Sequence, residues 1–302
     1  MNRTSIFISL AKVGLIILVV IFLYDSFESQ QIDLRYVKWP RDFGIYLFIV
    51  AALTVVNWSL EAIRWKVSVE VFEAVSLKDS LLMVLSGLAL NWVLPFTSGD
   101  AIVRWASLRD KYKTTSAMLL NRGIMLAITT VFGVYSIWFY SSSLLEFNLV
   151  IPLLIIGLFV LLFVARKSVG RFLSYFKQLR RVVLTKVIFL SVLRYFVFVV
   201  QFLMLLKVFL PTTSNAILLA GIGWVFFFRS AIPAFFGGLG LRETTGIIFF
   251  SDHIADLSLV VVPIFLLWLV NNAIPSVIGA IGLFRIQGLK WPTFVNKKRL
   301  VT

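Results

Sequence analysis

Two stretches of the chain decide the fold: LPFTSGDAIVR at residues 94–104 and IPAFFGGLGLR at residues 232–242. Each contains a proline, a glycine and an arginine at the same spacing. The matched residues are Pro95, Gly99 and Arg104 in the first stretch and Pro233, Gly237 and Arg242 in the second. Both stretches interrupt hydrophobic segments, so each predicts a broken helix. Broken helices at corresponding places in two halves of a membrane protein are the usual sequence sign of a transporter's binding site.

The composition around these stretches is that of an integral membrane protein. Of the 302 residues, 60% are hydrophobic, and the mean hydropathy is +0.97. The net charge of +15 comes from lysines and arginines that gather in short loops between apolar runs, as the positive-inside rule describes. We therefore expect anionic membrane lipids, and not nucleic acid, as the partner of this charge.

Hydropathy predicts six transmembrane helices. They lie at residues 5–24, 43–63, 115–140, 148–165, 186–207 and 257–284. Two apolar stretches remain, residues 80–110 and 214–251. The Pro/Gly pattern divides each of them into arms of about fifteen residues, which are short for a full crossing.

The charge of the loops predicts the sidedness. Residues 166–186 contain seven lysines and arginines and no acidic residue, so this loop is predicted to be cytoplasmic. Counting crossings from there places both termini and the loops at 64–79 and 109–113 inside. The same count places the loops at 25–42, 208–213 and 252–256 outside. Each broken stretch must then return to the side it came from, so we predict two re-entrant hairpins that enter from opposite faces.

The predicted fold is an all-α polytopic membrane protein, with about six transmembrane helices and two re-entrant broken-helix hairpins in an inverted repeat. Residues 1–145 form the first repeat, with its hairpin at about 80–110. Residues 146–302 form the second repeat, with its hairpin at about 214–251. Both repeats belong to one membrane domain.

Five charged residues lie in or beside the predicted hairpins: Asp100, Arg104, Arg229, Arg242 and Glu243. At the bilayer centre each would cost roughly 2.5–3.5 kcal/mol. We therefore expect these side chains to pair with one another, to line a water-filled cavity or to bind a charged ligand. On a helix, Asp100 and Arg104 share a face and can pair.

Other polar residues have more ordinary interpretations. Glu61 and Arg64 lie near the predicted cytoplasmic end of the second span, where long side chains snorkel. Arg194 either faces a cavity or pairs with an acidic residue, and Asn91 is expected to end a helix or bond its backbone. The chain has no cysteine, and its single histidine is His253 in a short polar loop. No metal site and no cofactor are therefore expected.

The second hairpin suits a phosphate. A helix that begins at the break presents free backbone N–H groups and the positive end of its dipole. Gly237, Gly238 and Gly240 would let an anionic headgroup approach the backbone. Arg104 and Arg242, from the two hairpins, could then hold it with forked hydrogen bonds. The alternative is that these charges are intramolecular ion pairs and that the prolines and glycines only shape turns.

The two motifs also resemble a known family. LNWVLPFTSGDAIVRWASL and, more specifically, PAFFGGLGLRE are similar to the signature stretches of the flippase-like family known as the lysylphosphatidylglycerol synthase transmembrane region. The resemblance covers nearly the whole chain, although Asp100 stands where the family often has Glu and Arg104 lies one position later than expected. It implies a protein of a bacterial or archaeal cytoplasmic membrane that moves an anionic or lipid-linked headgroup between leaflets. The polar segments leave no room for a synthase domain, so we expect the stand-alone membrane part.

The sequence thus predicts a lipid translocase that handles a phospholipid or a polyprenyl phosphate, and not an enzyme. Its predicted substrate-binding residues are Asp100, Arg104, Gly237, Gly238, Gly240, Arg242 and Glu243, with Arg64, Arg194 and Arg229 as further cavity charges. One alternative is a membrane-embedded phosphatase or transferase acting on a lipid phosphate, with Thr97, Ser98 and Asp100 as candidates by position. Another is a non-transporting subunit that anchors a separate glycosyltransferase or synthase.

Overall fold

The computed structural model describes residues 37–92, 94, 98–139, 175, 179–232 and 238–283. The predicted spans at 5–24 and 148–165 lie outside the described residues, as do Pro95, Pro233 and Gly237. The described part of the chain is helical and contains no strand.

Four helical segments are long and apolar enough to cross a membrane. They are α2 (Phe43–Val69), α5 (Lys111–Phe139), α8 (Arg181–Phe209) and the continuous run of α11 (Ser258–Trp268), the π-helical turn η5 (Leu269–Ala273) and α12 (Ile274–Leu283). These segments coincide with the predicted spans at 43–63, 115–140, 186–207 and 257–284. These four predicted helices are therefore confirmed, and their length and apolar character are consistent with a multi-pass membrane protein.

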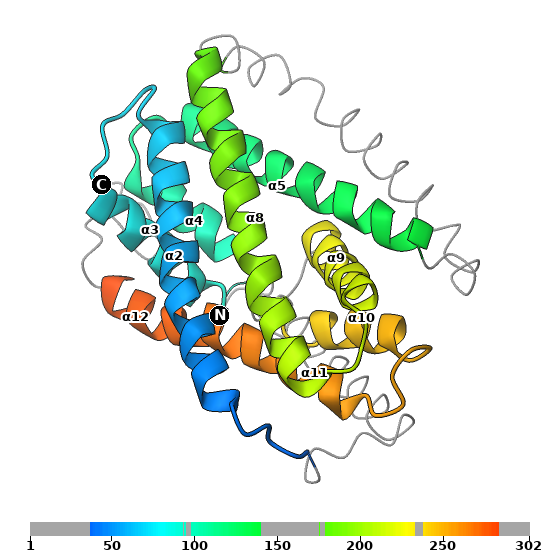
Figure 1. Cartoon of the computed structure of the whole chain (residues 1–302). Coiled ribbons are helices and arrows are strands. Elements are labelled where there is room, and N and C mark those ends of the chain that lie inside the picture. The colour runs from blue at the N-terminus through cyan, green and yellow to red at the C-terminus, as the bar shows by residue number, and fades with distance from the viewer. Residues whose placement is uncertain are drawn as a thin grey trace, which may run out of the picture.

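Helices α2 and α8 lie side by side (Figure 1) and run antiparallel. The contacts that join them have residue numbers that rise on α2 as they fall on α8. Gln201 Nε2 donates to the carbonyl oxygen of Val50 (2.8 Å) near one end, and Arg64 Nη1 donates to Ser191 Oγ (3.0 Å) near the other. Two shorter helices contact this pair: α3 (Leu77–Leu90) packs against α2, and α9 (Asn215–Ala231) packs against α8.

Each broken stretch forms a pair of short helices. In the first, α3 (Leu77–Leu90) begins at Ser76, whose hydroxyl accepts from Asp79 N (3.1 Å), and α4 (Ser98–Ser107) folds back on it. This return is tight: a β-carbon on Gly99 would collide with the backbone of Leu90 and Asn91. The predicted helix break between residues 90 and 98 is therefore confirmed. Its re-entrant path in a membrane stays a prediction.

The second pair is built in the same way. Helix α9 (Asn215–Ala231) begins at Ser214, whose hydroxyl accepts from Ile217 N (3.3 Å), and it packs against α10 (Leu241–Phe250). The close approach here is at Gly221, where a β-carbon would collide with the ring of Phe250. The chain thus turns back on itself twice, at corresponding places in the two motifs.

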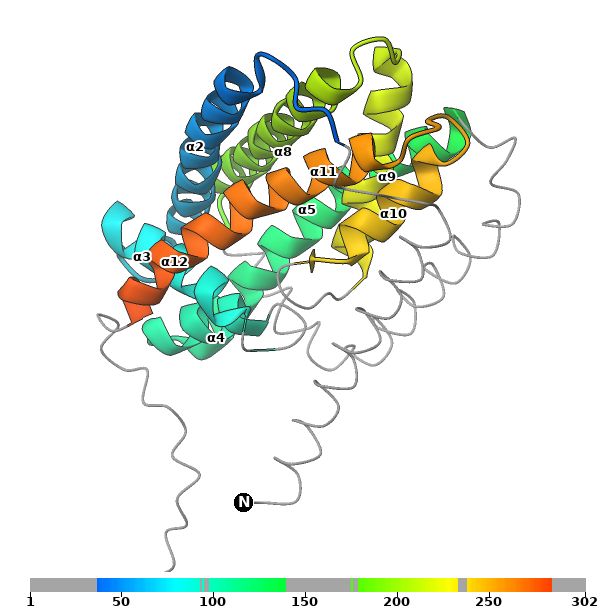
Figure 2. The ribbon, with the colours of Figure 1, turned by 90° about the horizontal axis from the view of Figure 1, so that it is seen from below.

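Each pair of short helices packs against a helix from the other half of the chain (Figure 2). Helix α3 packs along α12, where Ser86 Oγ donates to the Gly279 carbonyl (3.2 Å) and Gly279 leaves no room for a side chain beside Leu85. Helix α9 packs along α5, where Gly133 lies against Phe227 and Gly223 against Ser136. Small residues let the helix backbones approach closely at both contacts, as is common between membrane helices. This reciprocal packing is compatible with the predicted inverted repeat.

Two buried apolar clusters contain residues from the ends of several helices. One includes Trp65, Leu108, Ala117 and Leu179, and all the segments it joins are predicted to end on the cytoplasmic side. The other joins the start of α2, the end of α8, α9 and the start of α11, which the charge count groups on the outer side. The structure thus groups these ends as predicted, whereas the sidedness of each group stays a prediction.

Tyr175, in the basic loop at 166–186, lies at the first of these ends. Its hydroxyl donates to the carbonyl oxygen of Ser68 (2.8 Å) at the end of α2. Burial raises the pKa of Tyr175 above its ordinary value, so the phenol stays protonated and remains a donor. This contact joins Tyr175 to the α2–α3 end of the molecule.

Candidate functional site

Glu61 of α2 is the centre of a buried cluster of charges. Its carboxylate accepts from Arg104 Nη2 (2.8 Å) and Arg194 Nη1 (2.9 Å) and also pairs with Arg64. Glu61 and Arg64 are each only 4% exposed. The prediction that these two side chains snorkel to the cytoplasmic surface is therefore wrong, because both point into the contact between α2, α4 and α8.

A stripe of polar residues on α2 explains this burial. Thr54, Asn57, Glu61, Arg64 and Ser68 follow one another at intervals of three and four residues, so they share one helix face. That face is covered by neighbouring helices, and all five side chains are buried. The periodicity is visible in the sequence and is the signal that would have placed Glu61 and Arg64 inside.

The stripe extends into the π-helical turn of the last span. Arg194 Nε donates to Asn57 Oδ1 (3.0 Å), and Asn57 Nδ2 donates to Asn271 Oδ1 (3.0 Å). The indole N–H of Trp58 donates to the carbonyl oxygen of Asn271 (3.0 Å). A π-helical turn frees backbone carbonyls from the regular ladder and often occurs at functional sites. Here it supplies a buried acceptor that joins α2 to the α11–α12 segment.

At the first break, Arg104 is held between two carboxylates. Its Nε lies 2.7 Å from Asp100 Oδ1, and its Nη2 bonds Glu61. The guanidinium carbon also lies 4.4 Å from the ring centroid of Trp65, which adds a cation–π contact. The predicted pairing of Asp100 with Arg104 is confirmed. Asn91 accepts from the Asp100 N–H (3.2 Å), and so the prediction that its amide bonds the backbone is confirmed as well.

At the second break, two arginines converge on Gly238. A β-carbon placed on Gly238 would lie 3.4 Å from Arg242 Nε and 3.6 Å from Arg229 Nε. Gly238 has a φ of 89° and Gly240 a φ of 86°, in the region that favours glycine. Arg242 is 3% exposed. Among the described residues, Arg229 forms no ion pair, and its Nε has no hydrogen-bond partner.

Glu243 faces the backbone of the same turn. Its Oε2 accepts from the Gly240 N–H (2.7 Å), which caps the start of α10. This bond occupies the N–H that the sequence assigned to a bound anion at Gly240. Glu243, which follows Arg242 in the sequence, therefore stabilises the turn.

The spacing of the motifs allows the two breaks to be compared. Asn91, Asp100 and Arg104 of the first correspond to Arg229, Gly238 and Arg242 of the second. Asp100 supplies a carboxylate to the matched arginine, whereas Gly238 supplies no side chain. The two turns differ locally, because α4 already begins at Ser98 and α10 begins only at Leu241.

The two breaks are electrostatically connected. Arg229 lies within electrostatic reach of both Arg194 and Arg242. The described charges of the cluster are five arginines and three carboxylates: Arg64, Arg104, Arg194, Arg229, Arg242, Glu61, Asp100 and Glu243. These eight residues therefore carry an excess of two formal positive charges.

Arg122 of α5 was missed at the level of sequence. Its Nη2 lies 3.9 Å from Asp100 Oδ2, and the side chain is 52% exposed. A charged residue within the predicted span at 115–140 is itself a functional signal, and the hydropathy of its neighbours concealed it.

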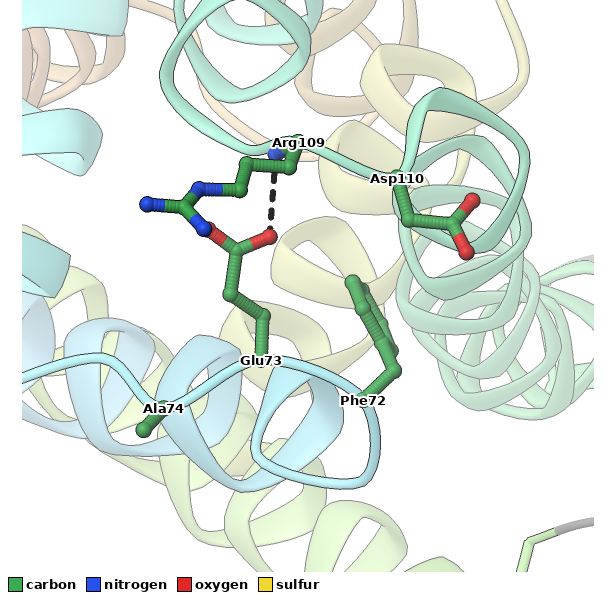
Figure 3. A pocket seen from close by; sticks show the side chains of 5 residues that line it. All are labelled: Phe72, Glu73, Ala74, Arg109 and Asp110. Carbon is green, nitrogen blue, oxygen red and sulfur yellow. Dashed lines mark hydrogen bonds between the residues drawn. The ribbon is translucent and has the colours of Figure 1, made fainter.

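A separate pocket of about 410 Å³ lies between the α2–α3 and α4–α5 connections (Figure 3). It is lined by Phe72, Glu73, Ala74, Arg109 and Asp110. Glu73 Oε2 accepts from the Arg109 N–H (2.9 Å), which joins the two connections. None of the buried cluster residues lines this pocket.

The structure provides fewer contacts for the residues named for a lipid-phosphate enzyme or for metal binding. Thr97 lies outside the described residues, and Ser98 is the first residue of α4. In the described part of the chain, no group of three or more His, Cys, Asp or Glu side chains could hold a metal ion. Comparison with protein-family models, curated proteins and solved structures gives no significant match. The family resemblance of the two motifs therefore stays a prediction.

Proposed function

We propose that this protein is a membrane transporter that moves the anionic headgroup of a phospholipid or polyprenyl phosphate between the two leaflets. The observation that carries the proposal is the convergence of Arg229 and Arg242 on Gly238. Cations within the membrane-spanning part of a protein are costly unless an anion or water accompanies them. A phosphate at this turn would lie beside both guanidinium groups.

The shape of the turn favours such a ligand. Gly238 has no side chain, so a phosphate could occupy the space between the two guanidinium groups. Guanidinium groups bind phosphate oxygens with paired, charge-assisted hydrogen bonds. The lipid tails would remain in the bilayer while the headgroup reaches this buried position.

The first break differs from the second. There, Asp100 and Glu61 already provide Arg104 with carboxylate oxygens, as the ion-pair alternative predicts for this arginine. We infer that the second break is the principal anion site and that Arg104 releases these carboxylates when the headgroup crosses to it. Two corresponding breaks would then give the transporter one anion position towards each leaflet.

The proposal can be tested in proteoliposomes with a headgroup-labelled anionic phospholipid, by measuring how fast the label becomes accessible from outside. A charge-assisted hydrogen bond contributes about 1.5–3 kcal/mol, and about 1.4 kcal/mol changes a rate tenfold. We expect Arg242→Ala and Arg229→Gln each to slow exchange roughly tenfold or more.

The matched control is Arg180→Gln, which removes an exposed arginine outside the cluster and should leave the rate unchanged. Parent-like exchange in folded Arg229→Gln and Arg242→Ala proteins would contradict the proposal. Release of the headgroup from the lipid by the parent protein would instead identify a lipid-phosphate enzyme.

A further inference from the structure

Arg122 occupies an unusual position for an arginine in a membrane-spanning helix. It is the eighth residue of the span predicted at 115–140, about 10 Å along the helix from the start of that span at a rise of about 1.5 Å per residue. Its side chain is 52% exposed. An exposed guanidinium within a membrane span is costly and marks a functional site.

An apolar groove lies next to this arginine. It has a volume of about 200 Å³ and is lined by Ser98, Ala101, Ile102, Trp105 and Met118. Met118 lies one helical turn before Arg122 on α5, so both residues belong to the same face of that helix. Ile102 is 42% exposed and Trp105 49% exposed, and the groove therefore opens to the surroundings of the protein.

The outer end of the groove has the character of a membrane interface. The Lys111 ammonium lies 4.7 Å from the ring centroid of Trp105 and donates to the carbonyl oxygens of Trp105 and Leu108 (both 2.6 Å). Tryptophan and lysine are enriched at the level of the lipid headgroups. The groove thus lies between an interfacial pair and Arg122.

Asp100 connects this face to the buried cluster. One of its oxygens lies 3.9 Å from Arg122 Nη2 and the other 2.7 Å from Arg104 Nε. The carboxylate is therefore shared between an exposed cation and a buried cation. An anion that reaches Arg122 is only one side chain away from the cluster.

We propose that the face between α4 and α5 is a lateral binding site for an anionic membrane lipid. The lipid phosphate pairs with Arg122, and an acyl chain contacts Ile102, where the groove opens to the bilayer. Apolar lining one helical turn from a cation complements an anionic amphiphile and not a soluble anion. The inference rests on the proposed function for the fate of this lipid, since this face is where the substrate would enter.

The test uses the absence of cysteine from the chain. A small fluorophore is attached at Ile102→Cys, and its quenching is measured in vesicles that contain either phosphatidylglycerol or phosphatidylcholine with brominated acyl chains. We expect the anionic lipid to quench at least threefold more effectively than the neutral lipid at equal mole fraction. Val131→Cys on α5, where the native side chain is 67% exposed, is the matched control and should show no preference.

Two substitutions then test the role of Arg122 in the labelled protein. Arg122→Gln should abolish the preference for phosphatidylglycerol, and Arg122→Lys should keep most of it, which also shows that the site remains folded. Equal quenching by both lipids at residue 102 of the parent protein would overturn the inference. A preference that survives Arg122→Gln would overturn it as well.

This measurement separates the lateral site from the transport proposal. Preference for the anionic lipid at residue 102 without any leaflet exchange would support the site and reject transport. Exchange that depends on Arg242 without such a preference would support transport and reject the site.

Discussion

Glu61 is the residue on which the buried charges depend most. It contacts three arginines from three helices, whereas Asp100 serves only Arg104 closely. Removal of one partner from a buried ionic network is costly because it leaves the remaining charges uncompensated. Glu61 therefore determines whether α2, α4 and α8 can pack together.

We expect Glu61→Gln to destabilise the protein by about 3–5 kcal/mol, because three guanidinium groups would lose their shared carboxylate. Denaturant unfolding in detergent micelles would measure the change. Glu70→Gln is the matched control on the same helix, since Glu70 pairs with Lys66 at the exposed end of α2 (3.0 Å). An exposed pair contributes about 0–1 kcal/mol. Equal effects of the two substitutions would mean that the buried cluster contributes no more than a surface pair.

At the scale of the elements, the helix breaks were the most predictable feature. Proline and glycine at matched positions locate both breaks, and serines at positions 76 and 214 cap the helices that lead into them. Four spans follow directly from hydropathy. The π-helical turn at Leu269–Ala273 was not predicted, although Pro275 is a local signal for it. Proline has no N–H to donate to the carbonyl oxygen four residues earlier, and that carbonyl, of Asn271, accepts from Trp58 instead.

The candidate site was predictable in part. The charges at both motifs are conspicuous in the sequence because they interrupt apolar segments. Their partners depend on which helix faces neighbour each other, which hydropathy alone does not specify. Thus Arg104 was matched to Asp100 four residues away, whereas its bond to Glu61, from a different helix, was not predicted.

The turn between α9 and α10 provides a test of the anion site. Gly238→Asp would place a carboxylate beside Arg229 and Arg242, where Asp100 stands in the first motif. We expect it to reduce leaflet exchange at least tenfold, because a tethered anion would compete with the phosphate. Gly238→Asn carries the same backbone strain and nearly the same volume without the charge.

The comparison of these two variants isolates the effect of the charge. Exchange by the Asn variant should be several times faster than by the Asp variant in the same proteoliposome assay. If the two variants are equally slow, strain or bulk in the turn explains the loss, and no anion site needs to be invoked.

At the scale of the whole molecule, the predicted topology places the α4–α5 connection and the turn after α10 on opposite sides. We expect a membrane-impermeant maleimide to label Asp252→Cys in intact cells and Tyr112→Cys only after the membrane is opened. Both native side chains are exposed, and the chain has no cysteine to interfere. Arg180→Cys should behave like Tyr112→Cys. Labelling of both test positions in intact cells would reject the inverted arrangement.

The reciprocal packing of the short helices determines how this molecule could move. Gly279 lets α12 pack closely against α3, and Gly133 lets α5 pack closely against α9. Each pair of short helices is therefore packed against a helix from the other half of the sequence. Separation of the two halves of the sequence would break both of these contacts. We therefore expect α3 and α4 to move together with α12, and α9 and α10 together with α5, in any rearrangement that preserves the packing.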